Sequence, residues 1–431
     1  MNWAKLSTKE DEAIPSHLRK ITGVLDFLDW ATGDDATEAE RLGEDDLVLM
    51  LDAHDVWLQL PPSVLIERYF ATNERANQRL LHDHPHLSSG RPLQTIIASS
   101  QKRCNAPRNI FSDLNCNSVP ESPLPDNVYG FFTDSVFADA HYDRPRYLNS
   151  GSFMGPAGDM RAYFQRVNDR MTEYLSQVQR EDDLSGDQGI FAEIWGEQEV
   201  FRNEQAALSA GPDEGKDSIR LRDQSSELEY HLGLDYTQEL FYPTCWSEHG
   251  GSFVPLQDSS LVSQASSKAG VTPPRIQDAP ADIHRAHAPL LLLSDSTTSW
   301  SSVPLFVDFW TTSIPVAIHH NAWKDGLKSR RTTWWDRTWF FPFLREMLEA
   351  RMVMQEDGNA TVPVAEMGAG KESLLVWPYP AEEGARAAML FGRQGLRGAD
   401  WDGVCERGGD DEVGVRWYEE VFRDGKGKFL L

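Results

Sequence analysis

The 431-residue chain carries a formal charge of −26, and 40% of its residues are hydrophobic, with 14 Trp and 20 Phe. This content predicts a folded protein, either one large domain with insertions or two smaller ones, and excludes a wholly disordered chain. A surface this acidic repels phosphate backbones, so we do not expect nucleic acid as a partner. An anionic cofactor would need a metal or a local basic patch to offset the negative charge.

The cysteines and the apolar runs argue against a cysteine-ligated zinc site and a membrane-spanning helix. Cys104, Cys116, Cys245 and Cys405 show no Cys-x-x-Cys spacing, which argues against a cysteine-ligated zinc site. Cys104 and Cys116 share one Pro- and Asn-rich loop and can pair in an oxidising compartment, although the sequence does not decide this. No stretch reaches the about 20 apolar residues that a membrane-spanning helix needs.

The first predicted elements are a helix, an acidic loop and a strand. The helix lies within residues 15–30, where apolar residues at spacings of three and four form one stripe. After the loop at 31–45, the apolar run Leu47–Leu51 ends in Asp52 and Asp55. Five consecutive apolar residues predict a strand that is buried on both faces, as in the middle of a parallel sheet.

Asp52 and Asp55 are the first candidate site. Two carboxylates three residues apart, at the end of such a strand, lie where open α/β sheets bind ligands. They can face one divalent cation. The alternative is an exposed acidic turn after a core strand, and the motif alone supports both interpretations equally.

Strands and helices then alternate, which is typical of an α/β fold. We expect helices from residue 62, at 155–177, from 185 and at 333–352. We expect strands at 95–98, 230–234, 238–241 and 314–320, and a strand, turn and strand at 147–154. Residues 246–290 are rich in Ser, Gln, Pro and Asp with little periodicity, which predicts an inserted, partly disordered loop.

Polar residues gather near the ends of several predicted elements. Besides the two aspartates, they are Asn149, Ser150, Gly151, Asp187, Gln188, His319, His320, Asn321 and Lys324. Strand-end positions of an α/β sheet converge on one crevice. Two carboxylates and an imidazole suit Mn²⁺, and its remaining positions would accept diphosphate oxygens. Such a metal would act as a Lewis acid on a leaving nucleoside diphosphate, with Lys324 adding positive charge.

The remaining candidates would contact the sugar and the reacting groups. Asn149 and Ser150 would bond sugar hydroxyls, and Gly151 would let a ligand approach closely. Asp187 would accept the proton of an attacking hydroxyl or orient the donor sugar, and Gln188 would bond either partner.

Each of these positions has a structural alternative. Residues 148–151 are compatible with a plain β-turn, and Asp187 with a helix N-cap. His319 and His320 are compatible with satisfied core histidines, and Lys324 with a solvated surface charge.

Four ordered segments, LMLDAHDVWLQLPP, RPRYLNSGSFMGP, SGDQGIFAEIWGEQ and VAIHHNAWKDGLKSR, carry a resemblance. The chain resembles the glycosyltransferase domain of procollagen lysyl hydroxylases and procollagen galactosyltransferase-like proteins, which are metal-dependent, UDP-sugar-using enzymes of the GT-A type. The similarity covers roughly residues 15–345. It implies an α/β fold of that type, with a Rossmann-like mixed sheet flanked by helices and with loop insertions.

The resemblance implies a role for each candidate. Asp52 and Asp55 match the Asp-x-x-Asp metal motif, and His319 matches the histidine of the His-x-Asn segment, the third metal ligand. The other matches are the sugar-site turn Asn149, Ser150 and Gly151, the acidic motif at Asp187 and Gln188, Asn321 of His-x-Asn, and the phosphate-contacting Lys324. The chain departs from the family at Gly186, where a second Asp is common, and at His320 and Ala322. The family's Cys-Trp-Pro loop appears as Cys104-Asn105-Ala106-Pro107, without the tryptophan.

The implied function is transfer of a hexose from a UDP-sugar to a hydroxyl of a glycan or protein acceptor, with Mn²⁺. GT-A folds open with a nucleoside-binding strand, whereas this chain begins just before the helix at Pro15. We therefore expect that strand to be missing from the glycosyltransferase domain, 1–345, with 346–431 as a Gly- and Glu-rich appendage. We expect the secretory pathway, the Golgi or ER lumen, if an upstream anchor or signal completes the chain, since its start shows no targeting signal.

Two other functions stay open. A catalytically inactive relative that binds a glycan or a partner would explain the missing strand and the absent second aspartate. A metal-dependent hydrolase would use the two aspartates and the histidine.

Overall fold

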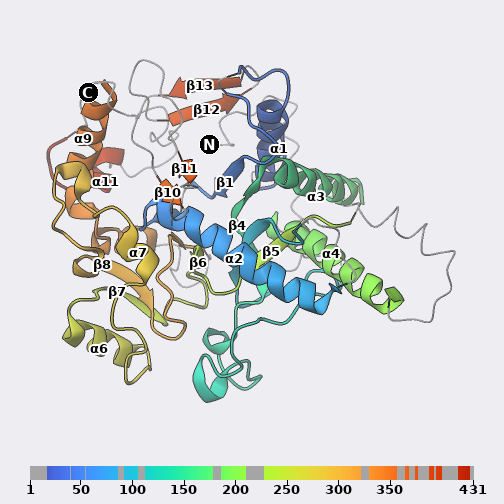
Figure 1. Ribbon diagram of the computed structural model, residues 1–431, viewed down its shortest axis with the longest axis horizontal. Coiled ribbons are helices and arrows are strands. Elements are labelled where there is room, and N and C mark those ends of the chain that lie inside the picture. Colours follow the sequence, from blue (N-terminus) through green and yellow to red (C-terminus); the bar gives the residue numbers. More distant parts are fainter. Residues whose placement is uncertain are drawn as a thin grey trace.

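The computed structural model describes residues 17–38, 40–53, 55–85, 92–104, 112–177, 186–209, 228–321, 330–356, 365–367, 374–376, 388–392, 395–399 and 416–427. These residues form a mixed α/β structure with several small sheets (Figure 1). No helix among them has both the length and the apolar character needed to cross a membrane.

The strands are β1 (Leu47–Leu51), β2 (Val56–Leu58), β3 (Ile96–Gln101), β4 (Tyr147–Pro156), β5 (Leu232–Asp235), β6 (Phe241–Pro243), β7 (Gly251–Pro255), β8 (Pro304–Asp308), β9 (Ala317–His319), β10 (Ala365–Met367), β11 (Leu374–Val376), β12 (Ala388–Gly392) and β13 (Gly395–Ala399). The helices are α1 (Arg19–Thr32), α2 (Pro62–Asp83), α3 (Ala157–Gln177), α4 (Gln188–Ser209), α6 (Ser259–Lys268), α7 (Ala281–Arg285), α8 (Arg330–Thr333), α9 (Leu344–Glu356) and α11 (Trp417–Phe422).

Two sheets position the candidate residues. The larger has the order β1-β4-β3-β5, in which β4 is antiparallel to both β1 and β3, and β5 is parallel to β3. The smaller has the order β2-β9-β6, with β2 antiparallel and β6 parallel to β9. The acidic turn between β1 and β2 therefore joins the two sheets, and β9 lies directly beside it.

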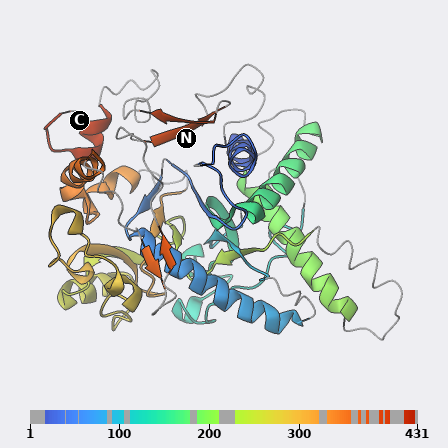
Figure 2. The same cartoon turned by 45° about the horizontal axis from the view of Figure 1, so that its top comes forward.

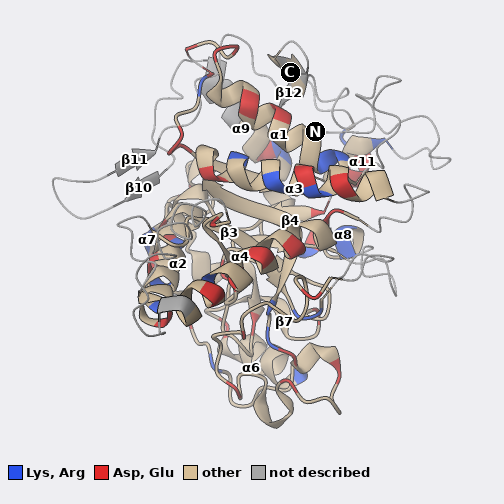
Figure 3. Ribbon diagram, turned by 90° about the vertical axis from the view of Figure 1, so that its right-hand side faces the viewer, with Lys and Arg blue, Asp and Glu red and all other residues tan. Residues whose placement is uncertain are grey.

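Helices cover the larger sheet and form its core. α1 packs against α3, and α4 packs against α3 and β4, so these three helices lie together in Figures 1 and 2. The apolar stripe of α1 meets Phe153, Tyr163 and Phe191 in one cluster. Burying each large apolar side chain contributes about 1.5–3 kcal/mol. Figure 3 marks acidic and basic residues along the ribbons of α3 and α4. Some of them pair across the two helices, as Arg170 does with Glu193 at 2.6 Å.

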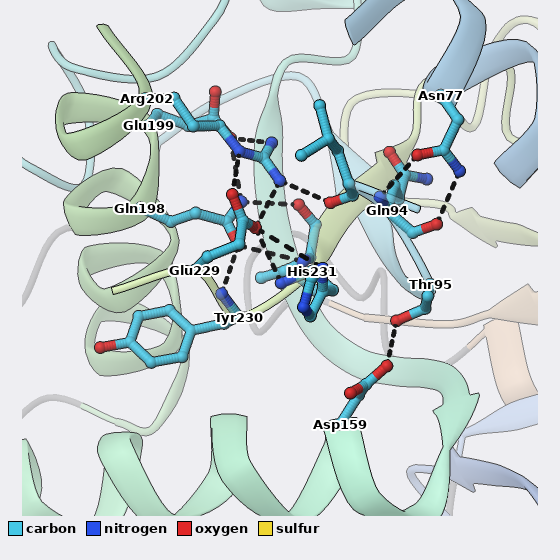
Figure 4. A network of polar contacts seen from close by, with 12 residues as sticks. Asn77, Gln94, Thr95, Asp159, Gln198, Glu199, Arg202, Glu229, Tyr230 and His231 are labelled. Atoms are coloured by element: carbon cyan, nitrogen blue, oxygen red, sulfur yellow. Dashed lines mark hydrogen bonds and ion pairs between the residues drawn. The ribbon is translucent and has the colours of Figure 1, made fainter. Parts of the chain in front are cut away.

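A buried polar network ties α4 to the start of β5 (Figure 4). The Arg202 guanidinium donates to Glu229 at 2.6 and 2.8 Å, to Glu199 at 2.9 Å and to the Leu93 carbonyl at 2.6 Å. Gln198 Oε1 accepts from the backbone amides of Tyr230 and Leu232. The buried charges are thus paired, and the buried backbone amides at the start of β5 have hydrogen-bond acceptors, which avoids the cost of burying unpaired polar groups.

Two features of the sheet region differ from the sequence-based expectations. β1 is antiparallel to β4 and lies at the edge of its sheet, and only Met50 in it is buried, so it is not the middle of a parallel sheet. Residues 147–154 form one continuous strand, β4, and not a strand, turn and strand. In its pairing with β3, Ser99 lies opposite Asn149 and Ala98 lies opposite Phe153, so the residues between Asn149 and Phe153 form a bulge. A bulge shifts the register of the strand but does not reverse the chain.

Residues 246–290 also differ from their prediction as an irregular loop, because they contain β7, α6 and α7. Asp258 caps α6 by accepting from the amides of Ser260 and Leu261. Val262, Val271 and Ile283 are buried in a second apolar cluster, but their irregular spacing left no periodic signal.

The helix expected at 333–352 begins only at Leu344, where α9 starts. Pro342 lies in a short 3₁₀ turn before it, and proline interrupts an α-helix because its ring removes a donor. Tyr418 and Phe422 of α11 pack against Leu344 and Leu348 of α9, so part of the predicted appendage contacts this helix.

Candidate metal site at the sheet junction

Three predicted ligands meet at the junction of the sheets. Asp52 follows β1, Asp55 precedes β2, and His319 ends β9 opposite Val56 in the β2–β9 ladder. His319 Nε2 lies 3.5 Å from Asp55 Oδ1 and 3.8 Å from Asp52 Oδ2. The structure therefore brings together a carboxylate pair and an imidazole from two sheets, with ligand atoms all within 4.8 Å of one another.

The orientation of the His319 ring is set by Asn149. Gly151 N–H donates to Asn149 Oδ1 at 3.1 Å, which fixes this atom as the amide oxygen because a backbone amide can only donate. His319 Nδ1 lies 3.0 Å from the same oxygen and must therefore carry the proton. The lone pair of the neutral ring is then on Nε2, the nitrogen that faces the aspartates.

Gly151 makes room for this ring. A Cβ on Gly151 would lie 2.2 Å from His319 Cε1, far inside van der Waals contact. The Gly151 carbonyl also accepts from Asp52 N–H at 2.9 Å. Glycine at this position thus permits close approach, and the group that approaches it in this structure is the imidazole of His319.

The side chain of Asn149 makes its hydrogen bonds to other residues of the chain. Asn149 Nδ2 donates to Gln101 at 2.9 Å and to Gln188 at 3.1 Å, so with His319 and Gly151 all its hydrogen-bonding positions are used within the chain. Gln188 Oε1 also accepts from Ser150 N–H at 3.4 Å. Asn149 and Gln188 therefore position β4, β9 and the start of α4 relative to one another.

Lys20 is a site residue that the sequence reasoning missed. Its Nζ lies 3.1 Å from Asp52 Oδ1 and 2.6 Å from Asp187 Oδ2, and it donates to the Ser150 carbonyl at 3.0 Å. Burial would lower the pKa of Lys20, but Asp187 and then Asp52 outweigh it and raise the pKa. The one available signal was a lysine beside the apolar stripe of α1, and no local spacing relates Lys20 to either aspartate.

Asp187 occupies the helix position that its structural alternative predicted. Its carbonyl accepts from the amides of Ile190 and Phe191, as an N-cap carbonyl does at the start of α4. Its side chain nevertheless turns to Lys20, beside Asp52. The residue is both the start of a helix and a carboxylate of the candidate site.

The three candidate residues after β9, which are His320, Asn321 and Lys324, differ in their surroundings. The His320 ring packs on Trp57 with ring centroids 4.1 Å apart, and its centroid lies 5.7 Å from that of Trp334. Burial, followed by the nearby His319, lowers the pKa of His320 to about 3, so it is neutral. Asn321 Oδ1 accepts from Cys245 N–H at 2.9 Å. Lys324 lies outside the described residues.

The donor set fits a divalent metal on two grounds. It combines carboxylate oxygens with an imidazole nitrogen whose tautomer is fixed by a partner, an arrangement common to metal-binding histidines. Glycine also stands where any side chain would displace the imidazole.

Comparison with known proteins identifies no family for this chain. No protein-family model matches the chain, and no curated protein matches it.

Proposed function

We propose that the protein is a metal-dependent glycosyltransferase that moves a hexose from a UDP-sugar to an acceptor hydroxyl. The convergence of Asp52, Asp55 and His319 Nε2 beside Asp187 carries the proposal. Two carboxylates and one imidazole suit Mn²⁺, which accepts oxygen ligands and histidine. The ordered motifs that resemble GT-A enzymes supply the substrate class.

Asp52, Asp55 and His319 would hold the metal, which when bound supplies positive charge to a leaving diphosphate. Lys20 pairs with Asp52 and Asp187 and fixes their orientation. Asp187 then offers a carboxylate that can accept the proton of an acceptor hydroxyl or hold a sugar hydroxyl. Asn149 keeps the His319 ring in the required tautomer.

The disulfide between Cys104 and Cys116 supports a secretory setting for this activity. Disulfides persist in oxidising compartments such as the ER lumen and the cell exterior. This supports our proposal of an enzyme of the secretory pathway that acts on a glycan or protein acceptor.

Replacement of a metal ligand tests the proposal. Asp55→Ala should abolish Mn²⁺-dependent transfer or hydrolysis of a UDP-hexose while the circular dichroism spectrum stays that of the wild type. Asp34→Ala, at an exposed aspartate, is the matched control and should keep full activity. Equal turnover by the Asp55 variant and the wild type would reject the assignment.

A binding protein without catalysis is the second candidate, and Lys20 is the observation that favours it. Its ammonium already compensates Asp52 and Asp187, so this acidic centre has less need of a metal. Calorimetry with UDP and Mn²⁺ separates the two functions. Joint binding of both ligands with turnover supports the enzyme, whereas binding of a glycan with neither ligand supports the second candidate.

A further inference from the structure

A second cluster of metal-ligating side chains lies outside the site described above. His141 belongs to a short 3₁₀ turn, Ala140–Tyr142, and Glu248 and His249 belong to the connection between β6 and β7. His141 Nε2 lies 3.2 Å from Glu248 Oε1, and His249 Nε2 lies 4.0 Å from the same oxygen. One ligand atom from each residue falls within 4.8 Å of the others.

The tautomer of His141 leaves the correct nitrogen for a metal. Asp139 Oδ1 accepts from the His141 backbone amide at 3.0 Å and also contacts His141 Nδ1. A carboxylate on Nδ1 holds the proton there and leaves the lone pair of the neutral ring on Nε2, which faces Glu248. Metal-binding histidines commonly have such a carboxylate behind them.

Glu248 brings a buried carboxylate oxygen without a partner. Its side chain is only 7% exposed, and Oε2 has no hydrogen-bond partner among the described residues. Leaving such an acceptor unsatisfied is costly, and a bound cation would satisfy it. Arg330 Nη2 lies 3.5 Å from the other oxygen, Oε1, so the guanidinium compensates part of the charge but does not reach Oε2 within bonding distance.

The spacing and the access suit zinc. Zn–N and Zn–O bonds of 2.0–2.1 Å place tetrahedral ligand atoms about 3.3 Å apart, close to the separation of His141 and Glu248. The His141 and His249 rings stack with centroids 4.4 Å apart, so His249 must turn slightly to complete the site. Its side chain is 73% exposed, which leaves it free to turn and gives an ion a path from solvent.

We propose that His141, Glu248 and His249 form a zinc site with a water molecule in the fourth position. Two imidazoles and one carboxylate are an established zinc donor set. The site is independent of the proposed transferase activity, because it shares no residue with Asp52, Asp55 and His319.

A bound ion would also have a local consequence. It would join the 3₁₀ turn at His141 to the connection before β7. This turn follows directly after the segment that exposes Phe131, Val136 and Phe137, so the ion would anchor the base of that segment.

The competing arrangement is a purely ionic one. A protonated His141 between Asp139 and Glu248 would satisfy the same contacts, and hydrogen bonding to Glu248 raises the pKa of His141 in that direction. The two arrangements differ in one measurable respect, which is uptake of zinc that depends on the exposed His249.

Zinc titration of the untagged full chain by calorimetry tests the proposal. His249→Ala removes an exposed ligand and is not expected to disturb folding. The wild type should bind one more Zn²⁺ per chain than this variant. His284→Ala, at an exposed histidine of α7 that pairs with Asp278, is the matched control and should bind as the wild type does. Asp55→Asn, which alters the first site, should retain the uptake that depends on His249.

Cobalt provides an independent readout of the same site. Co²⁺ in a tetrahedral His₂Glu site gives intense visible d–d bands, and these should appear in the wild type and be absent from His249→Ala and Glu248→Gln. Equal zinc stoichiometry in the wild type and His249→Ala, or the same cobalt spectrum in both, would overturn the proposal.

Discussion

His319 Nδ1 and Asn149 Oδ1 lie 3.0 Å apart and join β9 to β4 across the two sheets. Because Gly151 N–H identifies the Asn149 oxygen, this one contact sets the tautomer of His319. The backbone geometry of β4 thereby decides which imidazole nitrogen faces Asp52 and Asp55. Asn149, whose own hydrogen-bonding groups are all used, thus sets the tautomer of His319, the candidate metal ligand.

Asn149→Ala should weaken Mn²⁺ binding about 10–100-fold, the usual effect of removing a partner of a metal-bound histidine. The dissociation constant measured by calorimetry checks this. Asn77→Ala is the control. Asn77 lies on α2 and makes similar hydrogen bonds, to the backbone of Gln94, but it does not contact His319. If both variants bind Mn²⁺ like the wild type, Asn149 does not position His319.

Lys20→Met should have opposite effects on stability and on metal affinity. Loss of charged hydrogen bonds to Asp52 and the Ser150 carbonyl should lower the free energy of unfolding by about 1.5–3 kcal/mol without metal. The same change removes a positive charge beside Asp52, so Mn²⁺ should bind more tightly. Chemical denaturation and calorimetry measure the two effects, and Lys20→Arg, which keeps the charge, is the control. Weaker Mn²⁺ binding by Lys20→Met would contradict the assigned role.

Much of the site was predictable because its ligands stand at the ends of apolar runs. Asp52 and Asp55 follow the run of β1, and His319 ends that of β9, so strand ends located all three. The pairing of β2 with β9 was not predictable, because the two segments are far apart in sequence. Lys20 was missed for the same reason, since its partners come from other elements.

Continuity of strand β4 was hidden by its polar residues. Asn149 and Ser150 are both buried, and small polar residues beside a glycine are also typical of a turn. In the fold they lie in a bulge whose polar groups meet Gln101, Gln188, Lys20 and His319. The sequence pattern showed the polar residues but not the partners that make their burial favourable.

Asp235 should make stability depend on pH. Burial, only partly offset by the amides of Phe241 and Leu240, raises the pKa of Asp235 from 3.8 to about 6. The folded state therefore holds the proton more tightly than the unfolded state. The resulting stabilisation is full below about pH 4 and is lost as the pH rises through about 6.

Asp235→Asn should remove this dependence. Relative to the variant, the wild type should lose on the order of 3 kcal/mol of unfolding free energy between pH 4 and pH 7. Urea denaturation of both proteins across that range measures the difference. Parallel pH profiles would show that Asp235 titrates normally in the folded protein.

Arg202→Met should be among the most destabilising single changes in this chain. Arg202 pairs with Glu199 and Glu229 in the buried network of Figure 4, and removing it leaves both carboxylates without their cation. Breaking a buried ion pair in this way costs about 3–5 kcal/mol. Arg75→Met is the matched control, because Arg75 pairs with Glu239 at the surface, where a pair contributes about 0–1 kcal/mol. Similar losses in both variants, measured by denaturant unfolding, would mean that the network contributes no more than a surface pair.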